Sequence, residues 1–234
     1  MLAATEERMK RVKQNFKKQL EESQQNYSRD IAQMRKNFVQ FAPYKSDVEA
    51  GQKPDVAKAM QFLEREKKVL TDMAAREKSM QAGMQLFKLD RIDYPEIKNN
   101  EKEIRLLEKL WSLYENWFRH YDSWKGLEFT QLDPEQLDQF SRLNLNKLKK
   151  LFQQNKRVQG WQAWFTLDET IKQFKKTMGP INNLRNPAIR QRHWDTLKKE
   201  IGKSDFDPYR WVCMCGGGGG GGGFQRMDVN RNST

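Results

Sequence analysis

Several features that mark familiar classes of protein are missing from this sequence. Two cysteines, both near the C-terminus, are too few for a disulfide framework and fit a reducing compartment. No apolar run reaches the length of about eighteen residues that suggests a membrane span. The first residues lack the apolar core of a secretory signal peptide. We therefore expect neither a membrane protein nor a secreted disulfide scaffold.

Sequence motifs for catalysis and metal binding are also missing. There is no G-x-x-x-x-G-K-[ST] phosphate loop, no H-E-x-x-H zinc motif and no G-x-S-x-G nucleophile turn. The eight glycines at 216–223 lack the lysine and hydroxyl residue that a phosphate loop requires. Cys213 and Cys215 have no second cysteine pair nearby, which argues against a zinc site. We predict that this chain is not an enzyme and has no catalytic, cofactor-binding or metal-binding residue.

Charge is what the sequence has in abundance. Charged residues make up 32% of the chain and hydrophobic residues 37%, with a mean hydropathy of -0.97. This balance is too polar for one compact globule and fits long exposed helices. No alternating runs of valine, isoleucine and threonine predict strands. We predict an all-α fold, an elongated bundle of long antiparallel helices.

The net charge of +12 would suit an anionic partner such as nucleic acid or a microtubule. The basic residues, however, are scattered among 31 acidic ones along every helix. The densest basic patch, 147–150 with Lys156 and Arg157, has Phe152 as its aromatic neighbour. We interpret this patch as a solvated helix face and do not expect nucleic acid to bind. The alternative, a nucleic-acid-binding helical protein, predicts an affinity that falls steeply with salt.

Residues 1–41 have the pattern of one long amphipathic helix. Upstream, Met9, Val12 and Phe16 need a shifted heptad register, so the apolar stripe is interrupted. A coiled coil and packing against the chain's own bundle both remain open, and either requires a helical partner. The residues on the two heptad positions are Leu20, Tyr27, Met34 and Phe41 on the first, and Gln24, Ile31 and Phe38 on the second.

Residues 42–54 are expected to form a turn or linker, because they contain two prolines and a glycine. A helix follows from Asp55 to about Phe87. Its methionines could form an adaptable binding surface, but we favour ordinary filling of a hydrophobic core. The apolar positions of this helix include Met60, Leu63, Leu70, Met73, Met80 and Met84.

The third predicted helix, from Glu96 to about Trp124, has the most apolar face. So broad an aromatic stripe must be buried, and we do not expect it to stack nucleic acid bases. His120 lies on this helix without a second metal ligand four residues on, so we predict a polar or partly buried histidine. The stripe consists of Ile104, Leu107, Trp111, Tyr114, Phe118 and Tyr121, flanked by Leu110, Trp117 and Trp124.

A fourth helix is predicted from Asp133, its N-cap, to about Gln154. Gly160 should break the chain before Trp161 and Trp164. The side chains that we expect this helix to bury are Leu137, Phe140, Leu143, Leu148 and Phe152.

An αα-hairpin is predicted over 166–202. Thr166 and Glu169 have capping-box spacing, so the first helix should start at Thr166. Gly179 should adopt a left-handed conformation past the last turn, and Pro180 should prevent continuation. The apolar face of this first helix consists of Leu167, Ile171, Phe174 and Met178.

The second helix of the hairpin should have Asn186 as N-cap, Pro187 at its first position and Gly202 as its stop. A cluster of positive charge at its start could favour an anion. We favour instead ion pairs to a neighbouring helix, with the tryptophan packed inward. The cluster is Arg190, Arg192 and His193, and the apolar stripe is Trp194, Leu197 and Ile201.

The same stretch, with its spaced prolines, its run 184–188 (LRNPA) and its Arg-His-Trp at 192–194, resembles the start of the linker region of dynein heavy chains. Phe206 also fits this pattern. The LRNPA run resembles axonemal members of the family more than the other members. From about residue 55 the chain resembles the segment before the linker more loosely. The positions that carry the resemblance are Ile171, Phe174, Pro180, Ile181, Leu184 to Arg190, Arg192 to Trp194 and Leu197.

The resemblance implies a truncated, non-catalytic fragment at the end of the dynein tail and the start of the linker. It would transmit force and assist assembly in ciliary, microtubule-based movement. The implied partners are the dynein intermediate chain and light intermediate chain, other heavy-chain segments and the microtubule motor complex. The implied localisation is the cytoplasm and cytoskeleton, in the axoneme of cilia. An independent basic coiled-coil or helical adaptor remains the alternative.

We accordingly divide the chain into five segments. Residues 210–234, with their glycine run, are expected to be disordered because ordering consecutive glycines has the highest entropic cost. The other segments are the long helix 1–41, the linker 42–54, the helical bundle 55–165 that resembles the dynein tail, and the hairpin 166–209 that resembles the start of the linker region.

Overall fold

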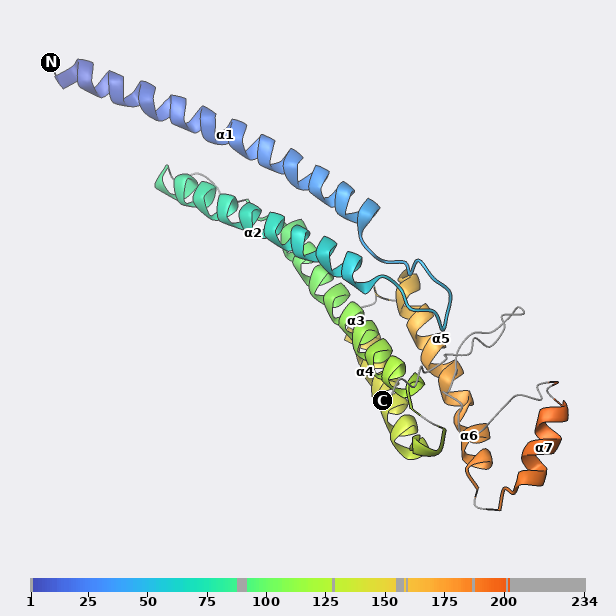
Figure 1. Ribbon diagram of the computed structural model, residues 1–234. Helices are drawn as coiled ribbons and strands as arrows, with labels where there is room; N and C mark the ends of the chain where they lie inside the picture. The colour runs from blue at the N-terminus through green and yellow to red at the C-terminus, as the bar shows by residue number, and fades with distance from the viewer. Residues whose placement is uncertain are drawn as a thin grey trace, which may run out of the picture.

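The computed structural model describes residues 2–87, 92–127, 129–154, 158, 160–186, 188–200 and 202. Within these ranges every regular element is helical, which confirms the predicted all-α class (Figure 1). The elements are α1 (Leu2–Phe41), α2 (Val56–Leu86), α3 (Pro95–Lys125), the 3₁₀ turn η1 (Phe129–Gln131), α4 (Pro134–Gln154), α5 (Gln162–Lys176), α6 (Met178–Leu184) and α7 (Gln191–Glu200). The predicted tail 210–234, with Cys213 and Cys215, lies outside the described residues.

The molecule is elongated, and its long helices run along it (Figure 1). The α1 and α2 helices lie side by side at one end and run in opposite directions. The α3 helix packs along α2 and continues to the other end, where α4 lies beside it. The α4 helix also packs on α5 and α6. The α3 helix therefore contacts α1, α2 and α4, and links the two ends of the molecule.

One continuous hydrophobic core extends from α1 to α6. The aromatic stripe of α3 forms its centre, as predicted, with Tyr114, Trp117 and Phe118 almost completely buried. The ring of Trp117 lies 5.7 Å from that of Phe140 in α4 and 5.3 Å from that of Phe174 in α5. Because each buried aromatic ring removes a large apolar area from water, these contacts stabilise three helices at once.

The α1 helix is packed unevenly. Its second half lies in the chain's own core, where Tyr27, Ile31, Met34 and Phe38 are buried. Packing against the chain's own bundle is thus confirmed for that half. The first half differs, since residues 5–19 are all exposed. The methionine stripe of α2 fills the core as predicted, with Met73 and Met84 buried.

Aspartate side chains cap the starts of α2 and α4, and the cap at Asp133 was predicted. The Asp55 carboxylate accepts a hydrogen bond from the Lys58 N–H at 3.1 Å, and α2 begins at the next residue. The Asp133 carboxylate accepts one from the Glu135 N–H at 3.0 Å, at the start of α4. Both carboxylates satisfy N–H groups that the first helical turn leaves unpaired.

The segment 42–55 is attached to the bundle along its length. The carbonyl of Tyr44 accepts a hydrogen bond from the Ala163 N–H at 2.9 Å. The Gly51 N–H donates to Thr170 Oγ1 at 2.9 Å, and this glycine has a φ of 91°, where a Cβ would be strained. The segment thus connects α1 to α2 and also ties both of them to α5.

The predicted start of the hairpin is wrong. The α5 helix begins at Gln162, and Thr166 lies inside it with its hydroxyl donating to the Gln162 carbonyl at 3.0 Å. Tertiary contacts explain the earlier start. Trp161 and Trp164 are buried on either side of Ala163, whose carbonyl accepts a hydrogen bond from the Tyr114 hydroxyl at 2.7 Å. Burial of the first turn outweighs the capping signal.

The predicted end of that helix is also wrong. The α5 helix ends at Lys176, and α6 begins at Met178 and contains Gly179 and Pro180. The left-handed glycines among the described residues are Gly51 and Gly202, which excludes Gly179. Pro180 is tolerated because it lies in the first turn of a helix, where its missing N–H has no intrahelical acceptor.

The second hairpin helix starts later than predicted. The α7 helix begins at Gln191, and the Asn186 side chain instead accepts a hydrogen bond from the Ala188 N–H at 2.9 Å. This asparagine therefore forms a local turn and does not cap α7. Gly202 has a φ of 66°, which confirms it as the stop. Pro187, Ile201 and Phe206 lie outside the described residues.

The α4 helix buries a face slightly different from the predicted one. Leu143 is 51% exposed, whereas Leu145 and Leu151 are buried. Leu137 and Leu148 are buried as predicted, and Phe140 and Phe152 pack at the edge of the core. The helix presents its Leu148 side to α3 and α5, and Leu143 lies on the other side.

Trp117→Ala should lower the free energy of unfolding by about 3–5 kcal/mol, because it opens a cavity between three helices. Leu143→Ala is the matched control on an exposed position and should change the unfolding free energy by less than about 0.5 kcal/mol. Urea unfolding followed by circular dichroism measures both. Equal losses for the two variants would contradict the core that we describe.

Candidate functional site

Buried polar contacts join α1, α3 and the segment between α1 and α2. Arg35 in α1 donates to Glu103 of α3 at 2.8 Å and to the Asn100 side-chain oxygen at 2.5 Å. The hydroxyl of Tyr44 donates to the other oxygen of Glu103 at 2.5 Å. Glu103 is only 5% exposed, so its carboxylate exchanges water for these two donors. We call Arg35, Tyr44, Asn100 and Glu103 the polar joint.

The polar joint fixes geometry more than it adds stability. Burial, and then the hydrogen bond to Glu103, raise the pKa of Tyr44 above its ordinary value, which keeps the phenol a donor. A buried ion pair stabilises the folded state little more than an apolar pair of the same shape. Removing one of its partners, however, destabilises the folded state strongly, because the other charge stays buried. The joint therefore sets the register of α1 on α3, because a shifted α1 would lose the contacts of Arg35 with both Glu103 and Asn100.

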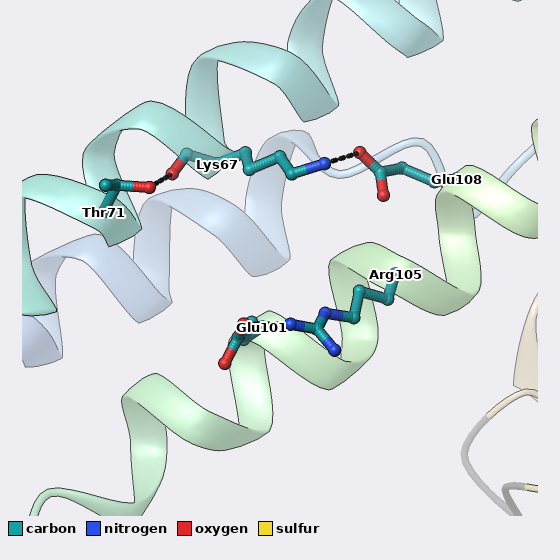
Figure 2. A network of polar contacts seen from close by, with 5 residues as sticks. All are labelled: Lys67, Thr71, Glu101, Arg105 and Glu108. Atoms are coloured by element: carbon teal, nitrogen blue, oxygen red, sulfur yellow. Dashed lines mark hydrogen bonds and ion pairs between the residues drawn. The ribbon is translucent and has the colours of Figure 1, made fainter.

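Ion pairs on the surface add little to this arrangement. Figure 2 shows Lys67 of α2 paired with Glu108 of α3 at 3.0 Å, above an Arg105–Glu101 pair within α3. Their long side chains are largely solvent-exposed, and such pairs contribute about 0–1 kcal/mol each. Lys67 also accepts a hydrogen bond at its carbonyl from the Thr71 hydroxyl at 2.8 Å.

An aromatic cluster joins α3, α4 and α5 at the other end. The ring of Trp124 stacks on Phe174 at 5.5 Å and meets the edge of Phe140 at 5.2 Å. His120 is half-buried against Phe140 at 4.3 Å, with its Nδ1 2.8 Å from the Asn116 carbonyl. His120 is therefore a packed histidine, as predicted. The described part of the chain holds no group of three or more side chains able to bind a metal ion.

The basic cluster at the start of α7 makes local contacts around the helix N-terminus. Nδ1 of His193 accepts a hydrogen bond from the Arg190 N–H at 3.0 Å. The Arg192 side chain lies 3.3 Å from the other ring nitrogen. Neither arginine has an ion pair with a carboxylate in the described ranges, so the predicted pairing to a neighbouring helix is not found there.

The tryptophan of α7 packs inward, as predicted. Trp194 is buried, and its ring meets the edge of Phe129 in η1 at 6.3 Å. Figure 1 shows α7 beside the rest of the bundle and separated from α6 by a turn. Because the remainder of α7 is mostly exposed, Trp194 is its main apolar anchor among the described residues.

The predicted basic patch on α4 is exposed to solvent. Lys147, Lys149 and Lys150 all lie on the outer face of the helix, as a solvated face requires. Lys156 and Arg157 lie outside the described residues. As for membranes, none of the described helices combines the length and the apolarity needed to cross a bilayer.

The fold and these contacts define a class: an elongated, all-α helical bundle. A family model described as dynein heavy chain, N-terminal region 2, matches residues 97–212. The match runs from the first turn of α3 through α7 and includes the predicted hairpin.

Curated relatives agree with the family model. The dynein-1-beta heavy chain of the flagellar inner arm I1 complex of Chlamydomonas reinhardtii is 31% identical over 210 residues, 89% of this chain and 4% of the relative. Human dynein axonemal heavy chain 2 is 28% identical over 206 residues, 88% of this chain and 4% of the relative. The ciliary dynein beta chain of Tripneustes gratilla is 28% identical over 137 residues, 58% of this chain and 3% of the relative.

The chain belongs to the dynein heavy-chain family, and its region of similarity is the N-terminal region of those proteins. It spans about 4% of the length of the first two relatives. The axonemal, flagellar and ciliary names of the relatives agree with the expected cytoskeletal and axonemal localisation. The resemblance that the hairpin residues carry is thereby confirmed.

Sequence reasoning missed the polar joint. A signal was present, because Asn100 and Glu103 share the α3 face that carries Ile97, Ile104 and Leu107. Two polar residues at core positions require buried partners. The identity of those partners, 65 and 68 residues away for Arg35, could not be read from spacing.

Alkaline pH should weaken the α1–α2 contact through Tyr27. Burial, and then the Glu77 carboxylate, raise the pKa of Tyr27 to about 12, against about 10 in an unfolded chain. Below pH 10 both states are protonated and this part of the stability is complete. Between pH 10 and 12 the unfolded state loses its proton first, so stability falls as pH rises.

Tyr27→Phe tests this prediction. It removes the hydrogen bond to the Met73 carbonyl and should cost about 1 kcal/mol at pH 7. The variant should nevertheless lose less stability than the unmodified chain between pH 10 and 12, measured by urea unfolding at each pH. Identical pH slopes would show that Tyr27 does not titrate in this way.

Trp194→Ala should release α7 from the bundle and leave the core intact. Hydrogen exchange of amides in 191–200 should accelerate at least tenfold, while the unfolding midpoint of the bundle changes little, because α7 adds few contacts to the core. The conservative variant Trp194→Phe should keep most of the protection. A large loss of global stability would mean that α7 is part of the core.

Proposed function

We propose that this chain is a non-catalytic, force-transmitting and assembly element of an axonemal dynein heavy chain, at the end of the tail and the start of the linker region. The observation that carries the proposal is that α3 to α6, which lie in the family match, share one buried core with α1 and α2. A load applied at α6 would reach α1 through packed side chains.

The packing of the bundle supports a mechanical role. Three independent attachments connect α5 to the rest: the Trp117 and Trp124 rings on Phe174, the Tyr114 hydroxyl on Ala163, and the Gly51 N–H on Thr170. The polar joint then fixes α1 on α3. Because close-packed interiors are only slightly compressible, such a bundle moves as one body under load.

The partners that fit this role are the dynein intermediate chain and light intermediate chain, other heavy-chain segments and the microtubule motor complex. The name of one relative supports this, since it belongs to the flagellar inner arm I1 complex. The chain acts in the cytoplasm and cytoskeleton, in the axoneme of cilia. It holds parts of the motor in position and hydrolyses no ATP itself.

The proposal is tested by expressing the tagged chain in a flagellated cell. The chain should remain in the axonemal fraction after detergent extraction and should co-precipitate dynein intermediate chain. The purified chain should show no ATP turnover above buffer, while whole axonemal dynein provides the positive control.

Leu107→Pro supplies the matched negative control, because a proline inside α3 disrupts the central helix of the core. This variant should lose both axonemal retention and intermediate chain. If the folded wild-type chain is retained no better than Leu107→Pro, the proposed role is wrong. ATP turnover that copurifies with the wild-type chain and disappears in Leu107→Pro would also overturn it.

A further inference from the structure

The first half of α1 extends past the helices that cover its second half (Figure 1). The Phe16 ring stacks on Phe87 at 5.8 Å, just past the last residue of α2, Leu86, so this contact marks the end of α2. From Phe16 back to Leu2 the helix continues for about 20 Å at 1.5 Å per residue. We call residues 5–19, all exposed, the α1 overhang.

The overhang carries an apolar stripe that is largely exposed to water, with Phe16 also in contact with Phe87. Met9 is 64% exposed, Val12 48% and Phe16 51%. At about 100° per residue, the centre of this stripe lies within roughly 40° of the α1 face that Tyr27 and Phe38 bury. The apolar stripe of the overhang therefore lies on nearly the same side of α1 as the residues that the second half buries. A stripe of this kind can pack against another helix.

Charge decides which kind of helix fits. The overhang has six basic and two acidic residues, a net charge of +4. Arg8 and Lys13 flank the stripe on opposite sides, and together with Thr5, Met9 and Val12 they line a shallow hollow. Residues that flank an apolar stripe meet the flanking residues of the partner helix.

Two other occupants fit less well. A second copy of the chain would bring the basic flanks of one overhang against those of the other, which is unfavourable. An anionic membrane would accept the charge, but helices that lie in a bilayer surface have a broad apolar face. Here three large apolar residues lie in fifteen, and charged residues cover the remaining sides.

We propose that the α1 overhang is a docking site for an acidic amphipathic helix of a partner chain, whose apolar stripe covers Met9, Val12 and Phe16 and whose carboxylates face Arg8 and Lys13. This inference goes beyond the proposed function, because it rests on α1 alone and holds whether or not the chain binds intermediate chain. If the overhang does not bind an acidic helix, the expected result of the axonemal assay is unchanged. If the chain is not retained in axonemes, the expected binding to the overhang is unchanged.

The test uses the whole 234-residue chain and two synthetic helical peptides of about three heptads with the same leucine stripe. One peptide has glutamate at the flanking positions and the other lysine. Fluorescence anisotropy should show the glutamate peptide binding at least tenfold more tightly at low salt. The difference should shrink at about 1 M salt, where the screening length falls to about 3 Å.

Variants separate the charge from the apolar stripe. Arg8→Glu with Lys13→Glu should reverse the preference, so that the lysine peptide binds more tightly. Lys147→Glu with Lys150→Glu on α4 makes the same change in net charge and should leave the preference unchanged. Met9→Gln with Val12→Gln should weaken both peptides at least tenfold. All these side chains are exposed, so thermal unfolding should be unaltered.

Three results would overturn the proposal. The first is equal binding of the two peptides, or no binding of either. The second is concentration-dependent dimerisation in sedimentation that Met9→Gln with Val12→Gln abolishes, which would make a second copy the occupant. The third is binding to phosphatidylserine vesicles that the same double variant abolishes while the glutamate peptide fails to bind, which would identify a membrane surface.

Discussion

The structure depends on one constraint: the aromatic face of α3 is too apolar to be left in water. Tyr114, Trp117 and Phe118 on this face are almost completely buried, and α3 packs against α1, α2 and α4. The fully buried Trp117 alone touches α4 through Phe140 and α5 through Phe174. The other long helices each bury the stripe that faces α3 or one of its neighbours.

Apolar packing by itself leaves the position of α1 along the bundle poorly specified, since stripes of similar residues can slide by a turn. The polar joint removes that freedom, because only one register gives the buried Glu103 carboxylate both Arg35 and Tyr44. Tyr44 also belongs to the segment that α5 holds through Ala163. One set of contacts thus orients α1, α3 and α5 together.

The family match begins at residue 97, but the physical unit does not. The core that includes Trp117 and Phe174 continues through α2 to Tyr27 in α1, so the matched region and the helices before it are stabilised jointly. In α1 the residues of this core end at Tyr27, and Phe16 meets Phe87 just past the end of α2. The proposed docking site lies outside the core, on the exposed residues 5–19 of α1.

The sequence by itself determined the all-α class, the long helices, the cap at Asp133 and the aromatic face of α3, because hydrophobic period and capping act over a few residues. It also carried the family resemblance in the hairpin. Only the tertiary structure decided that α5 starts at Gln162, that Asn186 makes a turn, that Leu143 is exposed and that Glu103 meets Arg35. Each of these outcomes depends on which distant surface covers a residue, and burial against a distant surface outweighs a cap or a turn preference of about 1 kcal/mol.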